Sequence, residues 1–245
     1  TAAFLAGTAD QKIAHAAFRK PGGVVLGGGS LRSRESGYTL LNRFHELRFV
    51  YILEQAAGAK VGLIGTNQNM IGNAALPTDR TTPESFEVQR LFREMADAGC
   101  AYAVMETSSH ALCLDRVYGV HYAVGIFTNL TQDHLDFHVT MENYCDAKAI
   151  LFRNCGVGVV NGDDPWTPRL LKDATCQVRT YGVKSEADLR AENVVLSANG
   201  IAFDAVEKSG SVPVQVGIPG GTSPAALWCI IRWMCWGPHW RWAFP

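Results

Sequence analysis

The sequence has no marked excess of charge of either sign. Its 245 residues include 22 lysines and arginines and 23 aspartates and glutamates, which gives a formal net charge of -1 and a pI of about 6.6. Proteins that bind nucleic acid or an anionic membrane surface through their overall charge usually carry a large positive excess. We therefore expect neither nucleic acid nor a membrane among the partners of this protein.

Long apolar runs and paired cysteines are also missing from the sequence. No apolar run approaches the ~20 residues that span a bilayer, and no segment combines a basic start, an apolar centre and a cleavage site. The seven cysteines include no Cys-x-x-Cys pair and mostly lie inside apolar runs, which is typical of reduced thiols. These features predict a cytoplasmic protein.

From about Val50 to Gly220 the sequence alternates short apolar runs with helical patterns. Such an order of strand, helix and strand is typical of an α/β fold in which helices flank a mostly parallel sheet. The predicted strands are residues 59–66, 100–107, 120–129 and 157–161, and the predicted helices are residues 81–99 and 141–152. A chain of 245 residues is long enough to bury a sizeable core in this fold.

The helix predicted at residues 81–99 has an apolar face and recognisable ends. Thr81 and Thr82 are candidate N-terminal caps, and Gly99 can end the helix. The apolar positions follow the spacing of one helix face and are Val88, Leu91, Phe92 and Met95.

Beyond residue 174 the pattern changes to short alternating strands, at residues 177–183, 189–197 and 200–208. The dipeptides Asn199-Gly200 and Ser209-Gly210 are typical of turns between such strands. This part of the chain is therefore predicted to form a small antiparallel β appendage.

Polar clusters follow three of the predicted strands. They are Glu106 to His110, residues 128–138 with the sequence TNLTQDHLDFH, and Asn161 to Asp164. Each cluster alone is explained equally well by the polar residues that loops and helix caps require. Ligands of a parallel sheet bind beyond the carboxyl ends of its strands, so three polar clusters at one edge favour a binding site.

Side chains in the first two clusters match the oxygen and imidazole ligands that hold Mg²⁺ or Mn²⁺ together with substrate phosphates. These side chains are Glu106, Asp133, His134 and Asp136. Zinc is less expected, because no two histidines or cysteines have the paired spacing of a zinc site. Lys148 has two interpretations: an exposed helix lysine, or a phosphate contact or modified metal ligand.

Several motifs together resemble the central domain of the Mur ligases. They are METSSHAL at residues 105–112, TNLTQDHLDFH at 128–138, YCDAKAILF at 144–152 and NGDDP at 161–165. GLIGTNQNMIGN at 62–73, followed by RTTPES at 80–85, is similar to the members that add a diamino acid to UDP-N-acetylmuramoyl-L-alanyl-D-glutamate. The similarity runs from about Val50 to Gly220.

The resemblance implies roles in substrate and nucleotide binding. Thr81 and Thr82 would contact the UDP-N-acetylmuramoyl dipeptide, and Ser108 and Arg116 would help to hold it. Asn161 would lie near the base of ATP.

The resemblance also implies a metal site. Glu106 and His134 would ligate Mg²⁺ ions that bridge the ATP phosphates and the substrate carboxylate. Lys148 matches a lysine that is carbamylated in the family, and its added carboxylate would support a second Mg²⁺. His134 and Lys148 are therefore the expected catalytic residues.

The activity implied by the resemblance is ATP-dependent amide-bond formation in peptidoglycan synthesis, carried out by a monomer. ATP would phosphorylate the terminal glutamate carboxylate to an acyl phosphate, and the amine of the diamino acid would then displace phosphate. Because two anions must meet, Mg²⁺ would offset their charge and orient the attack.

The two ends of the chain match the family less well. We expect residues 1–27 to be a remnant of the uridine-binding N-terminal domain, 28–49 to be unassigned, 50–220 to be the central ATPase domain and 221–245 to be an aberrant tail. The family's phosphate loop, TGTNGKT[TS], has no counterpart, since no Gly-Lys-Ser or Gly-Lys-Thr occurs in the sequence.

From these differences we expect that the phosphate-loop unit and the C-terminal ligase domain are missing and that this chain is an inactive or partial form. Our hypothesis is that the coding frame shifts soon after Gly220. Two alternatives stay open for the function. One is a related folylpolyglutamate-type ligase with another acceptor, and the other is a non-catalytic protein that binds UDP-muramoyl peptides.

Overall fold

The computed structural model describes residues 2–3, 24–26, 50, 54, 58–197 and 200–216. The contacts divide the chain into two compact units. Unit 1 is Thr1–Gly158 with Pro168–Gln177, and unit 2 is Val159–Thr167 with Val178–Pro245. The unassigned segment 28–49 and the tail 221–245 lie outside the described residues, as does nearly all of segment 1–27.

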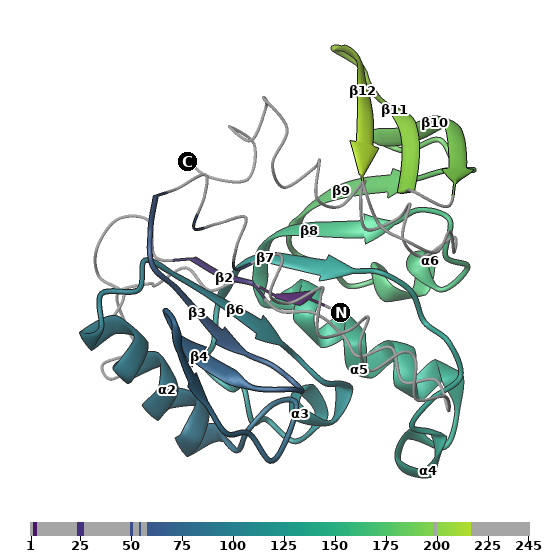
Figure 1. The fold of residues 1–245 in the computed structure, drawn as a ribbon. Coiled ribbons are helices and arrows are strands. Elements are labelled where there is room, and N and C mark those ends of the chain that lie inside the picture. The colour runs from purple at the N-terminus through teal and green to yellow at the C-terminus, as the bar shows by residue number, and fades with distance from the viewer. Residues whose placement is uncertain are drawn as a thin grey trace. The chain divides into compact units, whose positions relative to one another are not determined.

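Unit 1 contains a mostly parallel sheet, as predicted (Figure 1). Strand β6 (Tyr102–Glu106) pairs in parallel with β3 (Val61–Ile64) and with β2 (Val24–Leu26). The short strand β1 (Ala2–Ala3) pairs antiparallel with β6 and with β7 (Tyr122–Phe127). Strand β8 (Cys155–Asn161) begins in unit 1, and its last residues belong to unit 2.

A hairpin that the sequence analysis did not predict extends this sheet beyond β3. Strand β4 (Asn69–Ile71) pairs antiparallel with β3, and β5 (Ala74–Leu76) pairs antiparallel with β4. The turn contains Gly72, whose φ is +58°. The sequence analysis missed these strands because each has only three residues, too few to show alternation.

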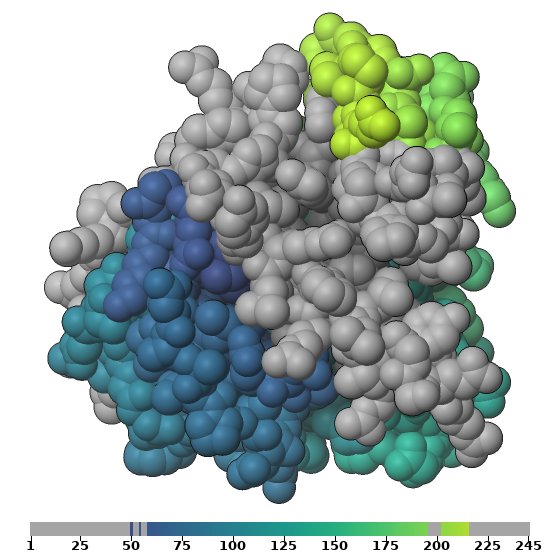
Figure 2. All heavy atoms as spheres, viewed as in Figure 1, coloured from purple at the N-terminus to yellow at the C-terminus, as the bar shows by residue number. Residues whose placement is uncertain are grey.

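Helix α2 (Ser85–Asp97) lies against β3, where Gly62 leaves room for Met95. A Cβ atom at Gly62 would come within 2.3 Å of Met95 Sδ, so any side chain at position 62 would require the Met95 side chain to move. The predicted apolar face is confirmed, since the buried residues of α2 are Val88, Leu91, Phe92 and Met95. Figure 2 shows α2 and the β4–β5 hairpin, in blue, as a closely packed surface.

The start of α2 differs from its prediction. Its N-cap is Glu84, which makes no side-chain capping bond, so capping by Thr81 or Thr82 was a wrong prediction. Thr82 is instead buried, and its hydroxyl donates a hydrogen bond to the backbone carbonyl of Glu106. The end of the helix agrees with the prediction, because Gly99, with a φ of +78°, directly follows the C-cap.

Helix α5 (Met141–Arg153) contacts β7 and two short helices, α3 (Ser109–Cys113) and α4 (Leu135–His138). Its N-cap is Thr140, whose hydroxyl accepts a hydrogen bond from the Asn143 amide. Its buried face carries a lysine, Lys148, among apolar side chains. No helix in the described part of the chain is both long and apolar enough to cross a membrane.

Unit 2 contains the predicted β appendage. Strands β10 (Leu189–Ser197), β11 (Gly200–Glu207) and β12 (Gly210–Val216) pair antiparallel, and β9 (Gln177–Gly182) pairs in parallel with β10. The three predicted strands correspond to β9, β10 and β11, the antiparallel pairing holds for β10 and β11 but not for β9, and β12 was not predicted. The short helix α6 (Thr167–Leu170) precedes β9 in the chain.

Candidate functional site

Glu106 is the last residue of strand β6, at the carboxyl end of a parallel strand, and its side chain is buried. Thr66, just after β3, donates to Glu106 Oε2 from its backbone amide at 3.2 Å and also from its hydroxyl. The Thr66 hydroxyl also lies 2.9 Å from that of Thr81. The ends of two neighbouring strands therefore fix the position of this carboxylate.

Thr82 links the start of α2 to the end of β6. Its hydroxyl donates to the backbone carbonyl of Glu106 at 2.7 Å and accepts from the Ser108 amide at 2.9 Å. Arg116 lies against the same segment, with Nε 3.1 Å from a Glu84 carboxylate oxygen. The Thr82 hydroxyl thus already has two partners within the protein, so its first role is to hold the site together.

Ser108 caps the short helix α3. Its hydroxyl accepts a hydrogen bond from the Ala111 amide at 3.1 Å. Ser109, the next residue, is buried, and its hydroxyl oxygen forms a hydrogen bond of 2.8 Å with His138 Nε2. The serine pair therefore fixes both the start of α3 and the orientation of a buried imidazole.

His134 precedes α4 in a left-handed backbone conformation, with a φ of 56°. Its backbone amide donates a hydrogen bond of 2.8 Å to Asp133 Oδ1, and its Nε2 lies 3.6 Å from Asp133 Oδ2. Asp133 Oδ2 is buried and has no hydrogen-bond donor among the described residues. Burying a carboxylate oxygen without a donor is costly, so this oxygen is suited to a cation.

Lys148 is buried, with 4% of its surface exposed, so the interpretation as an exposed helix lysine is wrong. Burial lowers the pKa of Lys148 to about 8, although the nearby carboxylates of Glu106 and Asp133 act to raise it. Its Nζ lies 4.8 Å from the ring centroid of Tyr144. A substantial fraction of this amine is therefore neutral slightly above neutral pH.

Imidazole and aromatic rings pack around His134. The His110 ring lies 5.0 Å from that of His134 between centroids, and the His138 ring stacks on Tyr144 at 4.9 Å. Burial, together with His110, His134 and Lys148, lowers the pKa of His138 to about 4, so this ring is neutral at physiological pH. His110 was present in the first polar cluster of the sequence but was not selected as a site residue.

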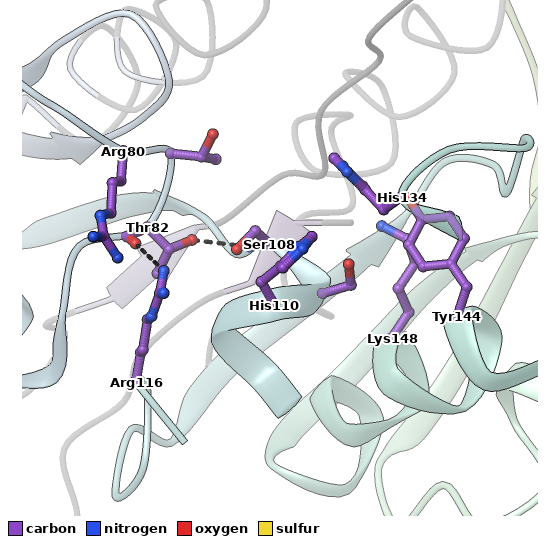
Figure 3. A pocket seen from close by; sticks show the side chains of 10 residues that line it. Arg80, Thr82, Ser108, His110, Arg116, His134, Tyr144 and Lys148 are labelled. Carbon is purple, nitrogen blue, oxygen red and sulfur yellow. Dashed lines mark hydrogen bonds between the residues drawn. The ribbon is translucent and has the colours of Figure 1, made fainter. Parts of the chain in front are cut away.

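One pocket of unit 1, with a volume of about 190 Å³, brings most of the predicted site residues together (Figure 3). Arg80, Thr82 and Arg116 come from one side, and His134, Tyr144 and Lys148 from the other, with Ser108 and His110 between them. The lining residues are Arg80, Thr81, Thr82, Ser108, Ser109, His110, Arg116, His134, Tyr144 and Lys148. Three cationic side chains in one small pocket favour an anionic ligand.

Two predicted site residues are not among those that line the pocket. Glu106 is connected to a lining residue, because its carbonyl accepts a hydrogen bond from the Thr82 hydroxyl. Asn161 belongs to unit 2, where its side-chain oxygen accepts a hydrogen bond from the Asp163 amide at 2.9 Å. The predicted contact of Asn161 with a nucleotide base stays a prediction.

The fold and this pocket define a Mur ligase middle domain. The model of the family described as "Mur ligase middle domain" matches residues 49–223, so the chain belongs to that family. The chain is 52% identical over 169 residues to the UDP-N-acetylmuramoyl-L-alanyl-D-glutamate--2,6-diaminopimelate ligase of Clostridium botulinum. It is 50% identical over 169 residues to the enzyme of the same name from Clostridium tetani. Both matches cover 69% of this chain and 35% of the relative, so the chain spans about a third of these proteins.

Solved structures agree with this assignment. A UDP-N-acetylmuramoyl-L-alanyl-D-glutamate--2,6-diaminopimelate ligase matches with a TM-score of 0.62 and 27% identity, over 76% of this chain and 39% of that one. The MurF ligase of Thermotoga maritima in complex with ADP matches with a TM-score of 0.60 and 16% identity, over 94% and 52%. The latter likeness shows the fold alone. The family resemblance and the fold class inferred from the sequence are confirmed.

Proposed function

We propose that this chain carries the substrate- and metal-binding part of an ATP-dependent ligase that joins 2,6-diaminopimelate to UDP-N-acetylmuramoyl-L-alanyl-D-glutamate in peptidoglycan synthesis. The names of the curated relatives support this substrate pair. The observation that carries the proposal is the pocket itself, in which the guanidinium groups of Arg80 and Arg116 line one small space. An anionic, carboxylate-bearing peptide fits such a pocket.

The kinds of side chain at the site, a carboxylate and an imidazole, are compatible with Mg²⁺. The described residues contain no group of three His, Cys, Asp or Glu side chains that could hold a metal alone. Mg²⁺ is usually bound by one or two carboxylates together with substrate phosphates, and it keeps several waters. Glu106 and His134 remain the proposed ligands, and the donor-free Asp133 Oδ2 is a third candidate. When bound, Mg²⁺ would offset the charge of the reacting anions.

Lys148 is proposed to provide a further anionic ligand after carbamylation. The neutral amine would attack CO₂, forming a nitrogen–carbon bond and releasing one proton, which leaves a carbamate on Nζ. Burial favours the neutral amine that this step requires, since the pKa of Lys148 is lowered to about 8. The change from cation to anion would place a carboxylate near Glu106 and Asp133, where a divalent cation could hold the three together.

The remaining pocket residues would orient the substrate. Arg116 and Arg80 would bind its carboxylates, because guanidinium groups form paired hydrogen bonds with them. The glutamate carboxylate would accept phosphate from ATP, and the amine of the diamino acid would displace that phosphate. Thr81 and Ser108 are proposed to contact the peptide part. We further propose that the protein acts as a cytoplasmic monomer.

A second candidate function is binding of UDP-muramoyl peptide without catalysis. The observation in its favour is that the sequence contains no Gly-Lys-Ser or Gly-Lys-Thr, the end of the phosphate loop expected for this family. Calorimetric binding of UDP-N-acetylmuramoyl-L-alanyl-D-glutamate, measured beside phosphate release from ATP with Mg²⁺ and diaminopimelate, separates the two. Binding with phosphate release supports the ligase, binding without release supports the second function, and no binding contradicts both.

A further inference from the structure

Two cysteines of unit 1 lie side by side although they are far apart in the sequence. Cys155 is the first residue of β8, and Cys176 directly precedes β9. Both are free thiols that are partly exposed. The two thiol groups are close enough to interact directly with each other. Contact between two partly accessible thiols is the arrangement from which a disulfide can form.

Glycines make room for both sulfur atoms. A Cβ atom at Gly158 would come within 2.8 Å of Cys176 Sγ, and one at Gly125 would come within 3.1 Å of Cys155 Sγ. A side chain at either position would displace a sulfur atom or the neighbouring strand. The local packing therefore accommodates the thiol pair closely.

The backbone next to each cysteine is also fixed. Thr175 donates from its amide to the Phe152 carbonyl at 3.2 Å and from its hydroxyl to the Arg153 carbonyl at 3.1 Å. These bonds attach the residue before Cys176 to the end of α5, two residues before Cys155. The contact between the thiols is thus set by anchored backbone on both sides.

The two thiols differ in acidity. The interaction with the Cys155 thiol lowers the pKa of Cys176, and so do hydrogen bonds from the backbone of Cys176 and Gly158. Burial acts in the opposite direction. The same interaction between the thiols, together with burial, raises the pKa of Cys155. Cys176 is accordingly the better nucleophile, and Cys155 remains a thiol that can react second.

We propose that Cys155 and Cys176 form a site of reversible modification, at which a low-molecular-weight disulfide oxidises the pair to an intramolecular disulfide. The Cys176 thiolate attacks one sulfur of the small disulfide, forms a mixed disulfide and releases the first small thiolate. Cys155 then loses its proton and attacks Cys176 Sγ, which releases the second small thiolate. Two protein thiols are oxidised and one small disulfide is reduced to two thiols.

The disulfide would link the first residue of β8 to the residue before β9, so that the segment between them becomes a covalently closed loop. The segment contains Asn161 but none of the residues that line the pocket. The inference therefore does not depend on the proposed ligase function. Cys113, which is exposed, and Cys145, which is buried, are internal comparisons within the same chain.

The test uses the full chain, equilibrated with glutathione disulfide, quenched by alkylation and digested with trypsin. Cys155 and Cys176 fall on separate peptides, 154–169 and 173–179, because cleavage sites lie between them. We expect these two peptides to be recovered joined, with the loss of two hydrogen atoms, and to separate after reduction. In the Cys155→Ser variant we expect the reaction to end with a mixed disulfide between Cys176 and glutathione, because the second thiol is missing. The Cys113→Ser variant should behave as the wild type.

Two results would overturn the proposal. One is recovery of Cys155 and Cys176 as free thiols under conditions that convert Cys113 to its mixed disulfide. The other is a stable mixed disulfide on both cysteines without the joined peptides. Cys176→Ser provides a second check, since Cys155 alone should then react more slowly than Cys176 does in Cys155→Ser.

Discussion

The hydroxyl of Thr82 donates a hydrogen bond of 2.7 Å to the backbone carbonyl of Glu106. The same hydroxyl accepts from the Ser108 amide, so one buried side chain joins α2, β6 and the start of α3. Thr82 and Ser108 themselves line the pocket. The integrity of the site therefore depends on a residue whose sequence position suggested a helix cap.

Replacing Thr82 with Val keeps the shape of the side chain and removes both hydrogen bonds. Because this leaves the Ser108 amide and the Glu106 carbonyl without a partner, we expect a loss of about 1–3 kcal/mol of unfolding free energy. Urea unfolding measures the change. The exposed Thr131 gives the matched control, and Thr131→Val should change the free energy by less than about 0.5 kcal/mol. Equal effects at both positions would contradict this account of Thr82.

Replacing Lys148 with Met should affect stability and binding in opposite directions. Burial of the ammonium group is unfavourable, so we expect the free energy of unfolding of the variant to be higher by about 1–3 kcal/mol, as measured by urea unfolding. Because the proposed metal ligand is lost, Mg²⁺-dependent binding of the UDP-muramoyl dipeptide should disappear. Lys172→Met, on an accessible part of the chain, should change neither property. A Lys148→Met protein that keeps Mg²⁺-dependent binding would contradict the proposed role.

Asp163 should make the stability of unit 2 depend on pH in the acidic range. Burial acts to raise the pKa of its carboxyl, but hydrogen bonds from Val183, Ser185 and Lys184 outweigh burial and lower it. A lowered folded pKa contributes stability that is present above the unfolded value of about 3.9 and is lost as the pH falls through the folded value. Asp163→Asn should therefore be less stable at pH 7, and the difference from wild type should shrink on acidification.

Urea unfolding of the wild type and Asp163→Asn between neutral and acidic pH measures this effect. Asp79 is exposed, and Asp79→Asn is the matched control, which should follow the wild-type curve. A difference between wild type and Asp163→Asn that stays constant with pH would show that the carboxylate charge is not responsible.

Val139 occupies a strained turn between α4 and α5. Its φ is 67° and its ψ is -44°, and the Thr140 amide donates to the His138 carbonyl at 2.8 Å across it. A β-branched residue with positive φ costs about 1–3 kcal/mol, whereas glycine adopts this conformation freely at an entropic cost of about 0.5–1 kcal/mol. We expect Val139→Gly to raise the unfolding free energy and Val139→Ala, which keeps a Cβ, to give no such gain. A loss of stability in Val139→Gly would contradict the strain.

The sequence allowed much of the fold to be predicted where periodicity is long. Helix α2 has four buried positions at helical spacing, and β6 and β7 are continuous apolar runs. The β4–β5 hairpin and the helices α3 and α4 were missed because they have only three to five residues, too few for a period to emerge.

Part of the site could be predicted from motifs and not from periodicity. Motif resemblance selected six residues that the structure places around one pocket. Arg80 and Tyr144 were not selected as site residues, although each begins a motif that carried the resemblance, at residues 80–85 and 144–152. The buried state of Lys148 could not be read from its position alone, since an isolated lysine on a helix is usually exposed.

Calorimetric titration with UDP-N-acetylmuramoyl-L-alanyl-D-glutamate tests the central claim most directly, when the wild type is compared with Arg116→Ala and Arg93→Ala. Arg116 lines the pocket, whereas Arg93 lies exposed on α2 and pairs with Asp97. A hydrogen bond to a charged group contributes about 1.5–3 kcal/mol, so we predict about tenfold or more weaker binding for Arg116→Ala and unchanged binding for Arg93→Ala. Equal affinity of all three folded proteins, or no binding by the wild type, would contradict the assignment of this pocket to the peptide substrate.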